Sequence, residues 1–414
     1  MTREAARICC LDLDTFFVSV ERLFDPTLVG KPVVVGGRPR SRGVVTAASY
    51  EVREFGVRSG MSLTQAWELA PHAVYLPTRH GEYSKYSQRV RAIAADFSPV
   101  VQAASIDEMY IDFAGCERLY ARAQDLHADA TIERTVRSLT ARIACELGLP
   151  SSAGIGTSRQ MAKVACGLAK PAGVLLVPAG HEREVLAPLP VRKYPGIGPV
   201  AEQKLQSVGI DTLGQLAVAP MPVVRRIFGS FASGIIRGAQ GEGSSQFGRE
   251  RPAFQEHDPE GELIGSISNE RTFREDVRDP ASIEAMLCSL CERVCFRARK
   301  RGIKARTVTL KLRYADFQTL SRSVTLTPTH SELELYPVVS ELFRRARQRR
   351  TPIRLLGLGL SNLGHYDEQL QLFEDHETLH QAVDGIRKRF GYDAVRLALP
   401  VGRRKRNSVN TRSR

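Results

Sequence analysis

The 414-residue sequence has no uninterrupted apolar run of about 18 residues, the length that a membrane-spanning helix needs. Its start carries Glu4 and breaks after a few apolar residues, so it lacks a signal-peptide pattern. The eight cysteines are scattered and stand mostly in apolar contexts, which suits a reduced compartment. We therefore expect a cytoplasmic protein with no membrane partner and no disulfide framework.

Acidic residues are the minority charge. The chain has 59 Lys and Arg against 45 Asp and Glu, a formal net charge of +14 and a pI near 9.6. Such an excess favours an anionic partner. With 43% hydrophobic residues the chain can bury substantial cores, and its length indicates several domains. No internal repeat of the solenoid type is visible.

Three cysteines, Cys288, Cys291 and Cys295, invite a metal-site interpretation. Their spacings of three and four residues place them on one face of a helix. An apolar face of this kind is more often core than metal site, so we expect these cysteines to be buried.

Carboxylates follow or interrupt apolar, strand-like segments at two places. Asp12 follows the run at residues 8–11, and Asp107 and Glu108 lie between strand-like runs at residues 100–104 and 109–113. The second arrangement predicts a tight hairpin corner. An aspartate at a strand end is usually a turn or cap residue, and we expect Asp14 to cap a helix that follows it.

The adjacent pair Asp107 and Glu108 is harder to explain as a turn, because the two carboxylates repel each other and a cation would relieve the repulsion. Mg²⁺ prefers oxygen ligands, usually one or two carboxylates together with substrate phosphates. Asp12, Asp107 and Glu108 could hold two such ions. Two-metal sites of this composition support nucleotidyl transfer.

The sequence resembles the Y-family translesion DNA polymerases of the bacterial DinB or DNA polymerase IV type. The matching motifs occur in the same order, and they are the segment at residues 8–17, the corner at residues 105–108 and the stretches described below. The resemblance runs from about residue 7 to residue 373. It implies an α+β multidomain fold, a right-hand polymerase with palm, small fingers, a helical thumb and a C-terminal α/β little finger. The implied divisions are palm 1–16 and 79–177, fingers 17–78, thumb 178–240, linker 241–251, little finger 252–366 and C-terminal extension 367–414.

A nucleoside triphosphate needs cationic donors that keep their charge at neutral pH. By resemblance to the family's phosphate-binding stretch, Tyr50 and Arg53 contact the β and γ phosphates, and Lys170 supplies a second cation. In isolation each could equally be a solvated surface residue. The family's threonine and asparagine in this stretch are replaced by Ala47 and Ser49, which puts one phosphate contact in doubt.

The resemblance assigns roles to three more residues near Asp12. It places Leu13 among the metal ligands and Phe16 among the nucleotide-binding residues. Phe17 corresponds to the family's steric gate, an aromatic ring that collides with a 2′-hydroxyl and so selects deoxyribonucleotides. The alternative is that Phe17 is a core residue at the start of a helix.

Residues 194–205 carry a helix-hairpin-helix signature, in which Gly196 and Gly198 expose backbone N–H groups to a phosphate near Lys204. A dinucleotide-binding interpretation fails because no strand precedes the turn and the third glycine is missing. Residues 291–313 hold nine Lys or Arg against one Glu, which is either a solubilising face or a phosphate-binding surface. From this segment we predict DNA contacts by Arg299, Lys300, Arg301, Lys304 and Arg306.

A short motif follows the implied little finger. Residues 369–373 resemble the pentapeptide Q-L-x-L-F that binds the bacterial sliding clamp, with apolar anchors for a groove and a glutamine for its rim. A chance match, or packing of the tail on the little finger, is the alternative. The predicted clamp-binding residues are Gln369, Leu370, Leu372 and Phe373. Residues 402–406 are basic, and we expect this tail to contact DNA.

The resemblance implies a template-directed DNA polymerase of the translesion type, without proofreading and of low fidelity. It would use two Mg²⁺ ions, dNTP and primer-template DNA, act as a monomer and bind the sliding clamp. The alternative is a non-catalytic scaffold of the same fold that binds DNA and the clamp. Such scaffolds lack the metal ligands, so the presence of Asp12, Asp107 and Glu108 favours the enzyme.

Overall fold

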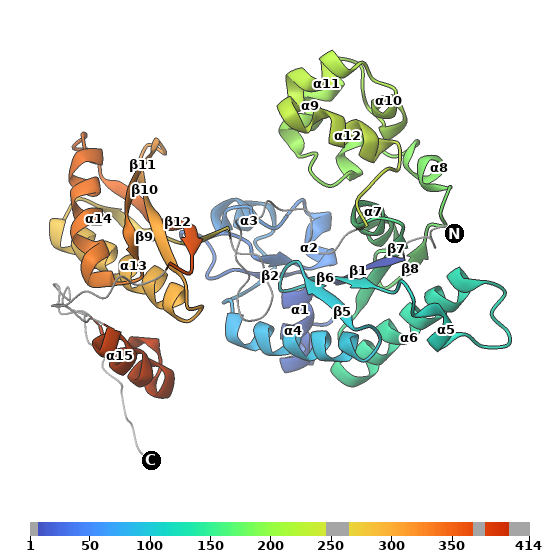
Figure 1. The fold of residues 1–414 in the computed structure, drawn as a ribbon, viewed down its shortest axis with the longest axis horizontal. Helices are drawn as coiled ribbons and strands as arrows, with labels where there is room; N and C mark the ends of the chain where they lie inside the picture. Colours follow the sequence, from blue (N-terminus) through green and yellow to red (C-terminus); the bar gives the residue numbers. More distant parts are fainter. Residues whose placement is uncertain (1–6, 246–264, 367–376, 397–414) are drawn as a thin grey trace. The chain divides into compact units, whose positions relative to one another are not determined.

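The computed structural model describes residues 7–245, 265–366 and 377–396 (Figure 1). The chain divides into two compact units, residues 1–247 and 248–414, and each is considered by itself. None of the described helices is long and apolar enough to cross a membrane.

A five-stranded sheet in the order β5-β6-β1-β7-β8 forms the centre of the first unit. Its strands are β1 (Ile8–Leu13), β5 (Val100–Ala103), β6 (Glu108–Asp112), β7 (Ser151–Gly156) and β8 (Val174–Leu176). The middle strand, β1, pairs antiparallel with both β6 and β7. Its near-continuous apolar sequence suits a strand that is covered on both faces.

Helices cover both faces of this sheet (Figure 1). They are α1 (Phe16–Phe24), α4 (His80–Ala95), α6 (Ala128–Leu147) and α7 (Arg159–Ala169), with the short α5 (Glu117–Tyr120) nearby. Alternate residues of β1 enter two cores. Leu11 packs in the core that includes α1, α4 and α6, whereas Cys10 packs with Cys166 of α7. A Cβ on Gly154 would lie 2.0 Å from the backbone nitrogen of Cys166, so α7 approaches β7 this closely only over a glycine.

The segment between α1 and α4 forms a smaller sheet in the order β3-β2-β4. Its elements are η1 (Pro26–Leu28), β2 (Val33–Val35), β3 (Ala47–Ala48), α2 (Tyr50–Glu54), α3 (Leu63–Leu69) and β4 (Val74–Leu76). Val34 packs in the segment's own core, but Val33 and Val35 belong to the core of the large sheet. The implied palm and fingers therefore share buried residues, and their boundary stays a prediction.

Residues 182–239 are mainly helical, and they share a core with Met161, Val164 and Ala165 of α7 and with Val177. The elements are α8 (Glu182–Leu186), η2 (Val191–Lys193), α9 (Pro199–Gln206), α10 (Leu213–Ala217), α11 (Met221–Phe228), η3 (Gly229–Phe231) and α12 (Ala232–Ala239). The end of this helical segment and the residues after it make contacts with other parts of the unit. Gly238 lies in α12 against Tyr194, and the Ser244 carbonyl accepts a hydrogen bond from the Arg159 N–H at 3.3 Å.

The second unit contains a four-stranded antiparallel sheet in the order β11-β10-β12-β9. Its elements are β9 (Ser266–Val277), α13 (Pro280–Arg299), β10 (Lys304–Tyr314), β11 (Thr319–Thr329), α14 (Glu332–Ala346) and β12 (Ile353–Gly364). Helices α13 and α14 cover one face of the sheet. Cys288, Cys291 and Cys295 are buried on α13, which confirms the core interpretation of their spacing.

Helix α15 (Glu377–Phe390), followed by η4 (Tyr392–Ala394), packs on this unit through buried charges. Arg387, whose side chain is 1% exposed, donates a hydrogen bond to Glu292 at 2.8 Å. Arg299 joins Glu332 and Asp384 in the same cluster. Because a buried charge is tolerated only when it is paired, these contacts hold α15 in one position.

Candidate active site

The sheet register brings the three predicted carboxylates together. Asp12 on β1 lies directly opposite Glu108 on β6. The backbone N–H of Leu13 donates to the Asp107 carbonyl at 2.9 Å, so the hairpin corner lies beside the end of β1. β5 ends at Ala103 and β6 begins at Glu108, which confirms the predicted hairpin.

Side chains also support the corner between these strands. The Ser105 hydroxyl donates to the Asp107 carboxylate and accepts a hydrogen bond from the Glu108 N–H at 3.0 Å. A serine that satisfies these groups stabilises a turn with two adjacent carboxylates. Asp107 and Glu108 are both half-buried, so a ligand can reach them from solvent.

Two lysines neutralise the carboxylates. Lys170 pairs with Asp12, and Lys163 pairs with Glu108. The two lysines are seven residues apart, with Lys163 on α7 and Lys170 immediately after it, so they lie on one side of the helix. Sequence analysis missed Lys163, although its spacing from Lys170 was the signal that could have found it.

Burial dominates the electrostatics of Asp12. Desolvation raises the pKa of this carboxyl, Asp107 and Glu108 raise it further, and Lys170 opposes the rise. For Lys170, burial alone would lower the pKa, but the hydrogen bond and charge of Asp12 raise it above its usual value. Three carboxylates, Asp12, Asp107 and Glu108, stand against two paired lysines, so acidic groups outnumber basic ones at this corner.

The donor set fits a hard divalent cation. Asp12, Asp107 and Glu108 offer only oxygen atoms, and ammonium groups pair with two of them, Asp12 and Glu108. As they stand, no three Asp, Glu, His or Cys side chains in the described part of the chain are grouped closely enough to hold an ion. The Leu13 side chain has no ligand atom, so only its backbone carbonyl could bind a metal ion.

The expectation that Asp14 caps the helix after it is wrong. Helix α1 begins after Thr15 without a side-chain cap, so Asp14 is not its N-cap. The Asp14 side chain is instead buried and accepts hydrogen bonds from the Ser152 hydroxyl at 2.7 Å and the Ala172 N–H at 2.8 Å. It also accepts one from the Tyr50 hydroxyl at 3.2 Å. Asp14 thus connects three separate segments of the site.

The predicted phosphate-binding residues lie around Asp14. Tyr50 bonds to it, and the Lys170 ammonium lies 3.8 Å from its carboxylate. The Arg53 guanidinium lies over the Tyr50 ring at 4.9 Å, and its Nε donates to the Ala48 carbonyl at 3.1 Å. The three predicted residues are therefore neighbours, and all are partly exposed.

Ser49, one of the departures from the family pattern, has a structural role. Its hydroxyl caps α2 by accepting from the Val52 N–H at 3.2 Å, and it accepts from the Val33 N–H at 3.1 Å. The serine can therefore hold α2 and Tyr50 in place. Ala47 offers no hydroxyl, and it pairs with Val35 in the small sheet.

The two phenylalanines of α1 differ in exposure. Phe16 is 3% exposed, so only its backbone could meet a nucleotide. Phe17 is half-buried and stacks on Tyr83 with ring centroids 4.1 Å apart. Tyr83, which sequence analysis missed, donates a hydrogen bond to the buried Glu21 at 2.6 Å. The stacked tyrosine fixes the Phe17 ring in one orientation.

The predicted helix-hairpin-helix contacts are accessible. Gly196 has φ of +95°, and a Cβ placed on Gly196 or Gly198 would meet no atom within 4 Å. Gly198 is the N-cap of α9, with Pro199 in the first turn, and Lys204 is exposed on the same helix. Backbone N–H groups at this helix start can therefore face an anion.

The predicted basic cluster at residues 299–306 is only partly accessible, and for Arg299 the prediction is wrong. The Arg299 side chain is 5% exposed and pairs with Glu332 and Asp384. A guanidinium already buried between two carboxylates cannot contact DNA. Lys300 and Arg306 are exposed, whereas Arg301 and Lys304 are half-buried.

Sequence analysis missed the uncovered face of the second unit's sheet. Along β10, Val308, Leu310 and Leu312 are buried, and the residues that alternate with them carry hydroxyl or basic groups. The Thr309 hydroxyl lies 2.9 Å from that of Ser323 on β11. The members of this polar face on β10 and β11 are Thr307, Thr309, Lys311, Arg313, Ser321 and Ser323. Period-two alternation at residues 307–313 was the available signal.

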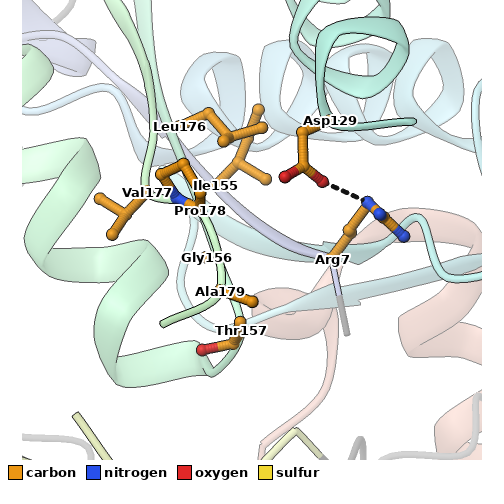
Figure 2. A pocket seen from close by; sticks show the side chains of 9 residues that line it. All are labelled: Arg7, Asp129, Ile155, Gly156, Thr157, Leu176, Val177, Pro178 and Ala179. Carbon is orange, nitrogen blue, oxygen red and sulfur yellow. Dashed lines mark hydrogen bonds and ion pairs between the residues drawn. The ribbon is translucent and has the colours of Figure 1, made fainter. Parts of the chain in front are cut away.

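A small pocket lies away from the carboxylates (Figure 2). It is lined by Gly156 and Thr157 at the end of β7, by Val177 after β8, and by the ion pair of Arg7 with Asp129 at 2.7 Å. Its volume is about 10 Å³. That is room for about one water molecule, so the pocket is no substrate site.

Carboxylates at the ends of paired strands, with cationic neighbours, form the kind of site that a nucleotidyltransferase uses. Residues 11–167 match the impB/mucB/samB family, residues 265–372 match its C-terminal domain, and residues 180–210 match the IMS family HHH motif.

Among curated relatives, DNA polymerase IV of Dehalococcoides mccartyi strain CBDB1 is 38% identical over 394 residues, covering 94% of this chain and 96% of the relative. DNA polymerase IV of Pelotomaculum thermopropionicum is 36% identical over 401 residues, covering 95% of each chain. The chain therefore belongs to the impB/mucB/samB family, the Y-family DNA polymerases of the DNA polymerase IV type. It is a DNA-directed DNA polymerase of the translesion type, and its mechanism depends on a divalent metal.

Solved structures show the same fold. A Y-family DNA polymerase chimera superposes with a TM-score of 0.74 at 24% identity, covering 86% of this chain and 98% of the chimera. The insertion ternary complex of Dbh DNA polymerase has a TM-score of 0.59 with the same coverage.

Proposed function

We propose that Asp12, Asp107 and Glu108 form the catalytic centre at which a nucleotide is joined to a primer 3′ end. The observation that carries this proposal is the register of β1 and β6, which sets Asp12 opposite Glu108 with Asp107 beside them. Two Mg²⁺ ions held by these carboxylates and the Leu13 carbonyl would stabilise charge on the reacting phosphate.

Around this centre, Lys170, Tyr50 and Arg53 hold the triphosphate of the incoming nucleotide. Their arrangement around Asp14 supports the assignment. Lys163 holds Glu108 in position while no substrate is bound. Phe17, fixed by its stack on Tyr83, excludes nucleotides with a 2′-hydroxyl.

Primer-template DNA is held mainly through its phosphates. Gly196 and Gly198 present backbone N–H groups, and Lys204, Lys300 and Arg306 add exposed positive charge. In the second unit, the polar face on β10 and β11 offers further hydroxyl groups. Contacts of this kind position a duplex without reading its sequence, so binding should weaken steeply with salt.

Primer extension tests the proposed function. With Mg²⁺ and one dNTP at a time, the purified protein is expected to add the nucleotide complementary to the template, on undamaged DNA and opposite a damaged base. Chelation of the metal should stop the addition, because the phosphate charge is then uncompensated. Extension that ignores the template base, or continues in excess chelator, would contradict the proposal.

The clamp partner is also part of the proposal. Residues 369–373 lie outside the described residues, so their sequence alone supports a clamp contact. A tether raises the local concentration of the polymerase at the primer end without changing its active site. Replacing Leu372 and Phe373 by alanine is therefore expected to abolish stimulation by the sliding clamp, while clamp-free insertion stays the same.

Extension assays with and without the clamp measure this effect. Leu379→Ala is a matched control, because Leu379 is an apolar side chain on α15 that is 52% exposed. If the motif only packs the tail onto the protein, the double variant will melt at a lower temperature yet keep its stimulation by the clamp.

A further inference from the structure

Asp14 is a carboxylate at the place where the proposed function puts the triphosphate of a nucleotide. Its side chain is 1% exposed and contacts Tyr50 and Lys170, two of the groups that are expected to hold the phosphates. A buried negative charge beside a polyanion is unfavourable unless neighbouring groups use that charge. The contacts of its two oxygen atoms show which groups use it.

One carboxylate oxygen of Asp14 is anchored to the large sheet and to the turn after α7. Oδ2 accepts hydrogen bonds from the Ser152 hydroxyl on β7 at 2.7 Å and from the Ala172 backbone N–H at 2.8 Å. Ser152 is itself completely buried. Because two donors from different segments meet at one oxygen atom, the Asp14 side chain is held in a single orientation.

The other oxygen of Asp14 faces the two phosphate-binding groups. Oδ1 accepts a hydrogen bond from the Tyr50 hydroxyl at 3.2 Å, and the Lys170 ammonium lies 3.8 Å from the same atom. Tyr50 begins α2 in the segment between α1 and α4, whereas Lys170 follows α7. A single oxygen atom therefore joins the two parts of the chain that form the proposed triphosphate site.

The turn that carries Lys170 has a strained backbone. Ala172 has φ of +51°, in the left-handed region that alanine adopts rarely. Such a conformation persists only where the surrounding structure holds it, and strained residues of this kind gather at ligand sites. The hydrogen bond from the Ala172 N–H to Asp14 supplies such a hold. Asp14 thus contacts both the backbone of this turn and the side chain of Lys170.

We infer that Asp14 is a positioning residue for the triphosphate, which acts through Tyr50 and Lys170 and touches neither the nucleotide nor a metal ion. It holds both donors in place before the nucleotide arrives, so less conformational freedom is lost on binding. Lys170 pairs with Asp12 as well as Asp14, so Asp14 keeps Lys170 near the site when Asp12 binds a metal ion. The inference rests on the proposed function, which supplies the triphosphate as the ligand.

Asp14→Asn separates the functions of the two oxygen atoms. The amide oxygen can still accept hydrogen bonds from Ser152 and Ala172, so the anchoring bonds remain. The amide NH₂ group, a donor, then faces Tyr50 and Lys170, which lose their acceptor. We expect the Kd for the correct dNTP to rise about tenfold, the effect of losing a hydrogen bond to a charged group. The kcat at saturating dNTP should stay close to the wild-type value, because the change affects binding alone.

The Kd is measured by titrating dNTP onto the protein with Mg²⁺ and a primer that ends in a dideoxynucleotide, so that no bond forms. A double-mutant cycle with Tyr50→Phe gives a readout that a purely structural role would not change. If Asp14 acts through Tyr50, Asp14→Asn will raise the Kd by a smaller factor in the Tyr50→Phe protein than in the wild type.

Glu292→Gln is the matched control for this experiment. Glu292 is also a buried carboxylate, 2% exposed, and it pairs with Arg387 in the second unit. The same chemical change at this position should leave the Kd for dNTP unchanged. Melting temperatures establish that each variant is folded. If Asp14→Asn does not fold, Ser152→Ala replaces it, because this variant removes one anchor of Oδ2 and should raise the Kd by a smaller factor.

Three results would overturn the inference. The first is a folded Asp14→Asn protein that binds dNTP as tightly as the wild type. The second is a cycle in which Asp14→Asn and Tyr50→Phe act independently. The third is a large loss of kcat with unchanged dNTP affinity, which would make Asp14 part of the metal site. A wild-type protein that binds no dNTP would refute the proposed function itself, so the two failures are distinguishable.

Discussion

Asp107→Ala is expected to reduce primer extension by about 10³-fold or more, because a metal ligand contributes several kcal/mol to charge stabilisation and each 1.36 kcal/mol is tenfold in rate. The variant should stay folded, since Asp107 is half-buried and its carboxylate is bonded only to the neighbouring Ser105 hydroxyl among the hydrogen bonds of the described chain. Single-turnover insertion measures the rate, and anisotropy measures DNA affinity, which should barely change.

Asp112→Ala provides the control for this experiment. Asp112 is the last residue of β6, whereas Glu108 is the first. The Asp112 side chain accepts a hydrogen bond from the Ala114 N–H at 2.9 Å. This variant should insert nucleotides at close to the wild-type rate. Near-normal insertion by Asp107→Ala would show that the corner between β5 and β6 is not the catalytic centre.

Phe17→Ala is expected to lower discrimination against ribonucleotides by about 100-fold, the order of selectivity that steric fit of one group can provide. The physical reason is the stack on Tyr83 at 4.1 Å, which prevents the ring from turning away from a 2′-hydroxyl. Single-nucleotide insertion with dNTP and rNTP gives the ratio of kcat/KM values directly.

Phe17→Tyr retains the ring and should keep the preference for dNTP. If Phe17 is only a core residue, Phe17→Ala will lower the melting temperature and leave the ratio between dNTP and rNTP unchanged. Because the ring is half-buried, its loss could change both nucleotide selection and stability. The melting temperature and the ratio between dNTP and rNTP should therefore be measured on the same variant.

Local patterns predicted much of the fold. The apolar run before Asp12, the hairpin corner at Asp107 and the helical face of the three cysteines each depend on residues close in sequence, and each appears in the structure as expected.

Pairings between distant residues could not be predicted. Arg299 looked like a DNA contact because it stands in a basic run, yet its partners Glu332 and Asp384 are 33 and 85 residues away. Asp14 looked like a cap, but it bonds to Ser152, 138 residues away. Charge is visible in a sequence, whereas the partner that neutralises it depends on the tertiary fold.

The central claim is that Asp12, Asp107 and Glu108 hold the divalent ions, and metal binding tests it without relying on turnover. Mn²⁺ can replace Mg²⁺ at oxygen ligands, and free Mn²⁺ is quantified by its electron paramagnetic resonance signal. The measurement is made with primer-template DNA and a non-hydrolysable dNTP present. Asp107→Ala should bind fewer Mn²⁺ ions per protein molecule than the wild type, and Asp112→Ala should bind the same number as the wild type. Equal Mn²⁺ binding by the wild type and Asp107→Ala would contradict the claim.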